Sequence, residues 1–207
     1  MNSQKISLWA ALFAIAPVHT SGCGSKGKEQ KDVAPAKKYT MSVSRSNMAP
    51  AATTVLPSAA APQSFSPMSE FNAEKNATYI KTPSVYLTNA PEFLTCAALY
   101  RFPDQTPKYP DNVWFHVAAM HPTAAWPAVQ LFYIRKGQAI YDFPVRYSQK
   151  QTNDGIIEEI SVTIPTDIFI QLFAGSDLTF QVEQTAYVIN GSHMQPFREL
   201  VSSVPSA

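Results

Sequence analysis

Residues 129–147, "VQLFYIRKGQAIYDFPVRY", carry the clearest structural signal in the sequence. Two runs of aromatic and β-branched residues flank a Lys-Gly dipeptide, and this pattern is typical of a β-hairpin. The second run carries bulky apolar side chains at alternate positions: Tyr141, Phe143, Val145 and Tyr147. Such alternation predicts a strand with one buried face, and Pro144 indicates a sheet edge or a bulge within it. We therefore expect an antiparallel sheet.

Strand-like segments recur on both sides of this hairpin. They are short runs of apolar and β-branched residues bounded by turn-forming residues, as is typical of strands. They lie at 79–88, 113–120, 156–164, 177–183 and 185–190. Pro83 in the first of them predicts an edge strand or two short strands.

Short helices are expected at 89–102, 166–175 and 192–204. In the first, Asn89 is a candidate N-cap and Glu92 follows three residues later, as in a capping box. Its apolar residues recur at helical spacing, but they also alternate from Leu94 to Phe102, so a strand is the alternative there. In the second helix, Thr166 is the expected cap.

Together these segments predict a single α+β domain on an antiparallel sheet with about three short helices. We expect this domain to span residues 76–207, because aromatic and β-branched residues become frequent near residue 76. A β-sandwich is the alternative architecture if 89–102 forms a strand.

The composition limits which kinds of partner the protein is expected to bind. The 207 residues have a formal net charge of +1, and 15% of them are charged. A nucleic-acid-binding face needs clustered Lys and Arg, so we expect no nucleic-acid partner. Two cysteines cannot build a disulfide framework. Cys96 lies among apolar neighbours and is expected to be a small buried side chain.

The first residues have the pattern of a secretory signal. Residues 1–5 carry a Lys and no acidic residue, and residues 6–18, "ISLWAALFAIAPV", are almost entirely apolar. This run is short for a membrane span but suits the apolar core of a signal peptide. The small residues Ser21 and Gly22 then precede Cys23.

Residues 1–24 resemble the signal of bacterial lipoproteins, whose conserved Cys becomes the acylated N-terminus. Ser21, Gly22 and Cys23 match that signal, whereas Thr20 stands where those proteins have a branched apolar residue. The resemblance implies a signal peptide at 1–22, cleavage after Gly22 and a lipid anchor on Cys23. Ordinary export with cleavage near Gly22 is the alternative.

The predicted location follows from the same resemblance. Gly24, rather than Asp, follows the Cys, which is similar to outer-membrane lipoproteins. We expect the protein in the outer membrane, facing the periplasm, with a soluble periplasmic protein as the alternative. Residues 23–75 are rich in Ala, Pro, Ser and Lys and show no sustained period, which predicts a disordered tether after the anchored Cys.

Residues able to do chemistry form no recognisable catalytic or metal-binding motif, so we expect no catalytic residue, metal or cofactor. His116 and His121 are an odd number of residues apart and would point to opposite faces of a strand. The neighbours Glu158 and Glu159 would do the same, and we expect them at a solvated edge. A site around His116, His121 or Cys96, or a metal held by the two histidines with His193, is the alternative.

The remaining candidates are two aromatic residues in Pro-rich loops, Trp126 and Tyr109. Exposed aromatic loop residues on a rigid sheet suit contact with a partner. The leading hypothesis is a non-catalytic component or accessory of a cell-envelope assembly, such as a secretion or conjugation system. A small periplasmic enzyme or ligand carrier and a surface or entry-exclusion lipoprotein are the alternatives.

Overall fold

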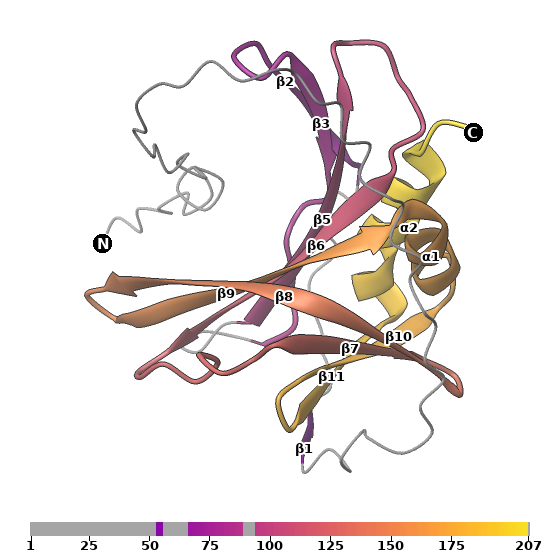
Figure 1. Ribbon diagram of the computed structural model, residues 1–207. Coiled ribbons are helices and arrows are strands. Elements are labelled where there is room, and N and C mark those ends of the chain that lie inside the picture. Colours follow the sequence, from indigo (N-terminus) through magenta and orange to yellow (C-terminus); the bar gives the residue numbers. More distant parts are fainter. Residues whose placement is uncertain (1–52, 56–65, 89–93, 207) are drawn as a thin grey trace, which may run out of the picture. The chain divides into compact units, whose positions relative to one another are not determined.

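The computed structural model describes residues 53–55, 66–88 and 94–206, all within one compact unit. They form an 11-stranded sheet in the order β1-β11-β10-β7-β8-β9-β6-β5-β3-β2, with β4 also paired to β5 (Figure 1). The strands are β1 (Thr53–Val55), β2 (Met68–Asn72), β3 (Ala77–Lys81), β4 (Val85–Tyr86), β5 (Leu94–Pro103), β6 (Asn112–His121), β7 (Leu131–Lys136), β8 (Ala139–Thr152), β9 (Gly155–Pro165), β10 (Asp177–Val182) and β11 (Thr185–Asn190). Neighbouring strands are antiparallel except β1 and β11, which are parallel.

The hairpin predicted from residues 129–147 is confirmed as β7 and β8. Gly137 in its turn has a φ of 58°, a left-handed conformation that glycine adopts without a steric penalty. β8 changes partner at Pro144, because residues up to Pro144 pair with β7 and those from Val145 pair with β9. Proline donates no backbone hydrogen bond and is tolerated where the pairing is interrupted. β8 therefore joins the two halves of the sheet.

Aromatic side chains fill the core between these halves. The ring of Phe115 in β6 lies 5.8 Å from that of Phe132 in β7, although β8 and β9 separate the two strands in the sheet order. Phe115 also lies 6.0 Å from Phe180 in β10. All three side chains are fully buried. The sheet therefore folds over, and its two halves face each other.

Helical segments cover the same core: α1 (Thr166–Phe173), the 3₁₀ turn η2 (Gly191–Met194) and α2 (Gln195–Ser203). They confirm the helices expected near 166–175 and 192–204. The rings of Phe173 in α1 and Phe197 in α2 lie 5.3 Å and 5.8 Å from Phe115. One aromatic cluster thus connects both helices to both halves of the sheet.

The expected cap of α1 is wrong. Pro165 occupies the N-cap position and Thr166 is the first helical residue. The Thr166 hydroxyl instead donates a hydrogen bond to the carbonyl of Pro110, and the Thr166 amide donates to the carbonyl of Asp111. These bonds fix the start of α1 to the segment that leads into β6.

The helix expected at 89–102 is wrong for the residues that the structure describes. Leu94–Pro103 is β5, as the strand alternative proposed. β5 pairs with β6 on one side and with β3 and β4 on the other, so it is an interior strand. Side chains on both faces of β5 are buried, such as those of the neighbours Cys96, which is 1% exposed, and Ala97, which is 6% exposed. Apolar residues are therefore required on both faces, and they produce a helix-like spacing by coincidence.

The described part of the chain is thus predominantly β. The antiparallel sheet is confirmed, but β5 replaces the third expected helix. The β-sandwich alternative is also incorrect, because the strands form one continuous sheet rather than two. No helix of the described residues is long and apolar enough to cross a membrane.

The boundary expected at residue 76 falls inside a hairpin. β2 precedes it and pairs with β3, from Met68 opposite Lys81 to Asn72 opposite Ala77. The folded part therefore includes residues that we expected in the tether. The predicted signal peptide, with Gly22 and Cys23, lies outside the described residues.

Candidate binding groove

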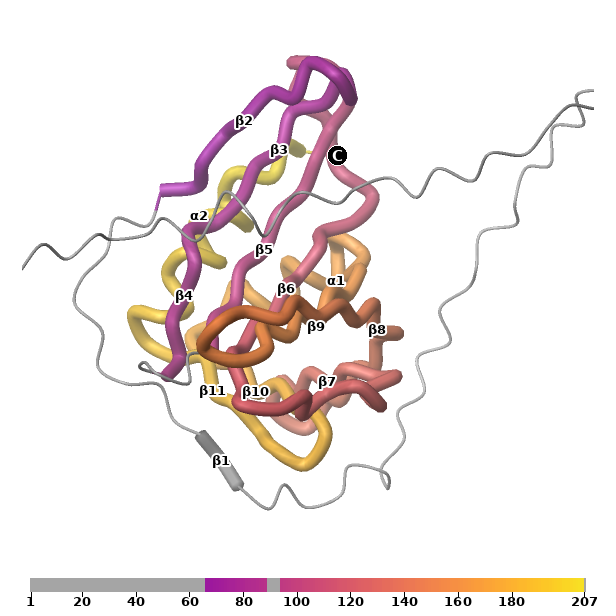
Figure 2. The backbone as a smooth tube through the Cα atoms, turned by 90° about the vertical axis from the view of Figure 1, so that its left-hand side faces the viewer, coloured from indigo at the N-terminus to yellow at the C-terminus, as the bar shows by residue number. Residues whose placement is uncertain are grey.

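Among the described residues, the strand β2 forms an edge of the sheet. It pairs with β3 on one side, and none of the described residues pairs with its other side. Its exposed side chains include Met68, which is 46% exposed, and Phe71, which is 41% exposed. Figure 2 shows β2, β3 and β5 side by side, with α2 behind them. An exposed edge strand with large apolar side chains is a surface to which another chain can add.

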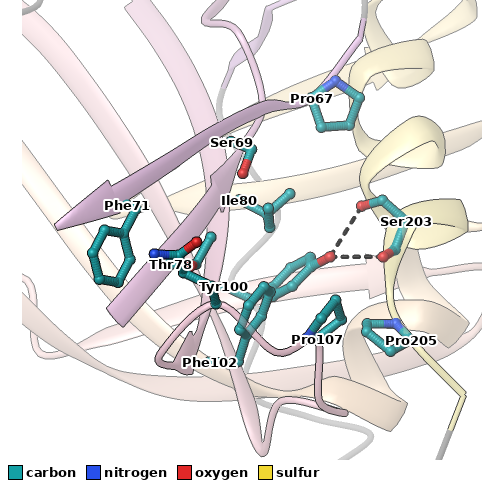
Figure 3. Close-up of a pocket in the computed structure, with 11 residues that line it drawn as sticks. Pro67, Ser69, Phe71, Thr78, Ile80, Tyr100, Phe102, Pro107, Ser203 and Pro205 are labelled. Carbon is teal, nitrogen blue, oxygen red and sulfur yellow. Dashed lines mark hydrogen bonds between the residues drawn. The ribbon is translucent and has the colours of Figure 1, made fainter. Parts of the chain in front are cut away.

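A groove with a volume of about 470 Å³ begins at this edge (Figure 3). Two rows of cross-strand neighbours from β2, β3 and β5 form one wall: Ser69, Ile80 and Tyr100, and Phe71, Thr78 and Phe102. The loop after β5 and the end of α2 complete the lining with Gln105, Pro107, Ser203 and Pro205, and Pro67 precedes β2. The groove therefore combines the end of the sheet with the end of the last helix.

Tyr100 connects the wall formed by the strands to the end of α2. Its hydroxyl donates a hydrogen bond of 2.7 Å to the carbonyl of Ser203 and lies 3.3 Å from the Ser203 Oγ. Burial raises the pKa of Tyr100, and the hydrogen bond to Ser203 lowers it by less. The phenol is therefore a neutral donor at neutral pH, and it fixes the end of α2 against β5.

The lining is suited to binding an uncharged surface. Its aromatic, aliphatic and proline side chains offer apolar contacts, and Ser69, Thr78 and Gln105 offer hydroxyl and amide groups. None of the lining residues carries a charge at neutral pH. Pockets of this volume, mostly apolar with a few polar groups, are typical of binding sites.

Of the two aromatic residues expected to contact a partner, one is buried and the other is half-buried beside α1. Trp126 is only 4% exposed, and its ring lies 5.2 Å from that of His121. The expectation that Trp126 is exposed is therefore wrong. Tyr109 is half-buried, and its hydroxyl donates a hydrogen bond to the carboxylate of Asp167 in α1. This bond raises the pKa of Tyr109 to about 12, with a smaller contribution from burial.

Trp126 is buried because Glu158 holds its loop against the sheet. The carboxylate of Glu158 is completely buried and accepts hydrogen bonds from the amides of Ala125 and Trp126, at 2.7 Å and 2.8 Å. The hydroxyl of Tyr147 donates a third bond, of 2.7 Å. The solvated edge expected for Glu158 is therefore wrong. Burial, followed by the hydrogen bond to Glu158, raises the pKa of Tyr147 to about 12.

The alternative site around the histidines and Cys96 does not converge. The Nδ1 of His116 lies 2.8 Å from Glu159 on one face of the sheet, whereas His121 lies beside Glu158 on the other. The opposite orientation of the two histidines is thus confirmed. Cys96 is free and buried, as expected, and burial raises the pKa of its thiol.

His193, the third histidine of the alternative metal site, is buried in η2. No group of three or more His, Cys, Asp or Glu side chains that could hold a metal occurs in the described part of the chain.

Sequence analysis missed the groove because its residues fell in segments assigned to other structures. Ser69 and Phe71 fell in the expected tether, and Tyr100 and Phe102 fell in the expected helix. The signal that could have revealed β2 is the polar turn at 73–76, which separates the two short segments "MSEFN" and "ATYIK". That pattern indicates a hairpin.

Comparisons with protein-family models, with curated proteins and with solved structures find no match to this chain.

Proposed function

We propose that this chain is a bacterial envelope lipoprotein whose folded domain binds a protein partner in the groove beside β2. Acyl chains on Cys23 anchor it in the outer membrane, and the domain faces the periplasm. It acts by binding rather than by catalysis, as a component or accessory of a cell-envelope assembly such as a secretion or conjugation system.

The observation that carries the proposed binding is the exposed apolar surface at the groove. Phe71 lies at the sheet edge, 41% exposed, and continues into an uncharged lining. Covering the exposed part of this ring with a partner would contribute about 1 kcal/mol, before the contacts made inside the groove. A protein partner can cover both the ring and the free backbone edge of β2.

The proposed location rests on the sequence of residues 1–24. An apolar segment followed by Ser21, Gly22 and Cys23 supports export and lipid attachment. The Lys-rich residues that follow suit a position beside anionic headgroups, where each such charge contributes about 1 kcal/mol. A lipid-anchored protein meets its partners at the membrane surface, which favours an envelope assembly.

Site-specific photo-cross-linking in the protein's own cells tests this function. A photoreactive amino acid replaces Phe71 in the full-length chain, and a matched chain carries it at Tyr86. Tyr86 is 43% exposed on β4 but does not line the groove. We expect position 71, but not position 86, to yield one discrete cross-linked product with another envelope protein. Absence of a product from position 71, or equal products from both positions, would refute binding in the groove.

A further inference from the structure

We propose that the groove binds an extended segment of its protein partner, which adds a strand to the free edge of β2. This segment alternates apolar side chains, which enter the groove, with basic side chains on the opposite face. The inference rests on the proposed function, since it specifies the partner segment bound by the same groove.

The backbone of β2 provides the first part of the argument. Met68–Asn72 pairs with β3 on one side only among the described residues, which leaves backbone groups on the other side available for pairing. An extended peptide satisfies such groups by adding a strand, and alternate side-chain sites then supply specificity. A helical partner would leave the edge uncovered.

The groove determines one face of the added strand. Ser69 and Phe71 belong both to the edge strand and to the groove lining. A side chain of the added strand beside Phe71 would therefore extend the row formed by Phe71, Thr78 and Phe102. Because the lining is uncharged, a charged side chain placed there would lose its hydration without gaining a partner. This face of the added strand is therefore apolar.

Glu70 determines the opposite face. It lies between Ser69 and Phe71, so its side chain points away from the groove. Glu70 forms an ion pair of 2.7 Å with Lys81 and is still 63% exposed. A Lys or Arg on the added strand would lie across from Glu70, on the side away from Lys81. Opposite charges on neighbouring strands stabilise their pairing.

The same residue disfavours a second copy of this chain as the added strand. Glu70 is the central residue of Met68–Asn72. A symmetric antiparallel pairing of two copies of β2 would therefore place two Glu70 side chains directly opposite each other. Like charges in such a position are destabilising, so the geometry favours a different chain with basic residues.

Peptide binding to the purified full-length protein in detergent tests the inference. The probe is Lys-Val-Lys-Phe-Lys-Val-Lys, labelled with a fluorophore, and binding is measured by fluorescence anisotropy. We expect it to bind more tightly than its non-alternating rearrangement, Lys-Lys-Val-Phe-Val-Lys-Lys, and than the alternating peptide with Glu in place of Lys. We also expect it to slow amide hydrogen exchange in β2, because strand addition pairs those amides.

Two charge-reversal variants separate recognition from general electrostatics. Glu70→Lys should weaken binding of the basic peptide about fivefold, which is the factor expected for one cross-strand charge pair. The same change should strengthen binding of the acidic peptide. Glu74→Lys makes the same charge change in the exposed turn after β2 and should leave both affinities unchanged. Phe71→Ser should weaken both peptides.

Several results would overturn the inference. If both charge variants have equal effects, or if no peptide slows exchange in β2, strand addition at this edge is wrong. A concentration-dependent dimer that protects β2 would identify a second copy as the occupant instead. If position 71 still cross-links to an envelope protein in cells, the proposed function survives and only the mode of binding fails.

Discussion

Glu158 shows how a single residue can position a whole loop. Its face could be predicted, because neighbouring strand residues point in opposite directions, and Glu159 does contact His116 on the other side. Its burial could not be predicted, because the loop that covers it comes from a distant part of the chain, at Ala125 and Trp126. A pair of acidic residues in a strand indicates solvent only when no such loop covers it.

Replacing Glu158 by Gln should destabilise the protein by about 2 kcal/mol. Gln has one acceptor oxygen and a donor group in place of the carboxylate, so part of the buried donor set of Ala125, Trp126 and Tyr147 loses its partner. Urea unfolding measures the effect. Glu159→Gln is the matched control, and it should cost less because the Gln amide can still form a hydrogen bond with His116 and the site is not completely closed to water. Equal costs for the two variants would contradict the assigned role of Glu158.

The raised pKa of Tyr147 predicts that the protein loses stability at high pH. Its pKa is raised to about 12 in the folded protein, against about 10 for an unperturbed Tyr. Between these values the folded state retains a proton that the unfolded state has released, so the free energy of unfolding falls as the pH rises. Below about pH 10, Tyr147 makes its full contribution to the free energy of unfolding. Urea unfolding across this range should show a shallower fall for Tyr147→Phe, and an unchanged slope would contradict the raised pKa of Tyr147, which burial and the bond to Glu158 produce.

At the scale of elements, strands with one buried face were predictable and a strand buried on both faces was not. The alternation in β8 and β9 identified those strands because one side of each faces the core. β5 contains buried residues of both parities, such as Cys96 and Ala97, and its sequence fits a helix equally well. The competing helix signal was therefore a consequence of the interior position of β5 in the sheet.

The groove could not be predicted for the opposite reason, because β2 is mostly exposed. β2 is a short, exposed strand, and only one of its inward positions, Phe71, carries a large apolar side chain. Short edge strands with polar residues carry little periodic signal, because burial does not constrain both faces. Its pairing with β3 becomes visible only in the structure, where Phe71, Thr78 and Phe102 lie in one row.

Among the phenylalanines of the core, Phe115 should be the one whose removal destabilises the protein most. Its ring contacts those of Phe132, Phe173, Phe180 and Phe197, from both halves of the sheet and both helices. Phe115→Ala should lower the free energy of unfolding by about 3–5 kcal/mol. Phe71→Ala removes the same side chain at the exposed edge and should cost less than about 1 kcal/mol. Comparable losses in urea unfolding would refute the assignment of the core.

At the scale of the whole molecule, local sequence signals do not specify how the sheet closes over its core. The contact between Phe115 and Phe132 joins strands that are separated by two others in the sheet order. No hairpin or helix signal encodes such a contact, because it depends on the change of pairing partner along β8 at Pro144 and on the aromatic rings of the helices. The antiparallel sheet was predictable, and its folding over was not.

The proposed function depends at this scale on the lipid anchor that we propose at Cys23. Acyl chains bind a protein stably to a membrane when at least two of them are present, because each buried methylene group contributes about 0.8 kcal/mol. Without them, a free periplasmic domain would meet envelope assemblies only by diffusion. We therefore propose that attachment at Cys23 determines where the groove is presented.

The most direct test is the intact mass and membrane partitioning of the full-length chain, expressed with its own N-terminus beside Cys23→Ser. We predict that the wild-type protein begins at Cys23, carries added acyl mass and fractionates with membranes, and that Cys23→Ser does none of these. If both chains are soluble and unmodified, the lipoprotein assignment is wrong, and the groove belongs to a freely diffusing domain.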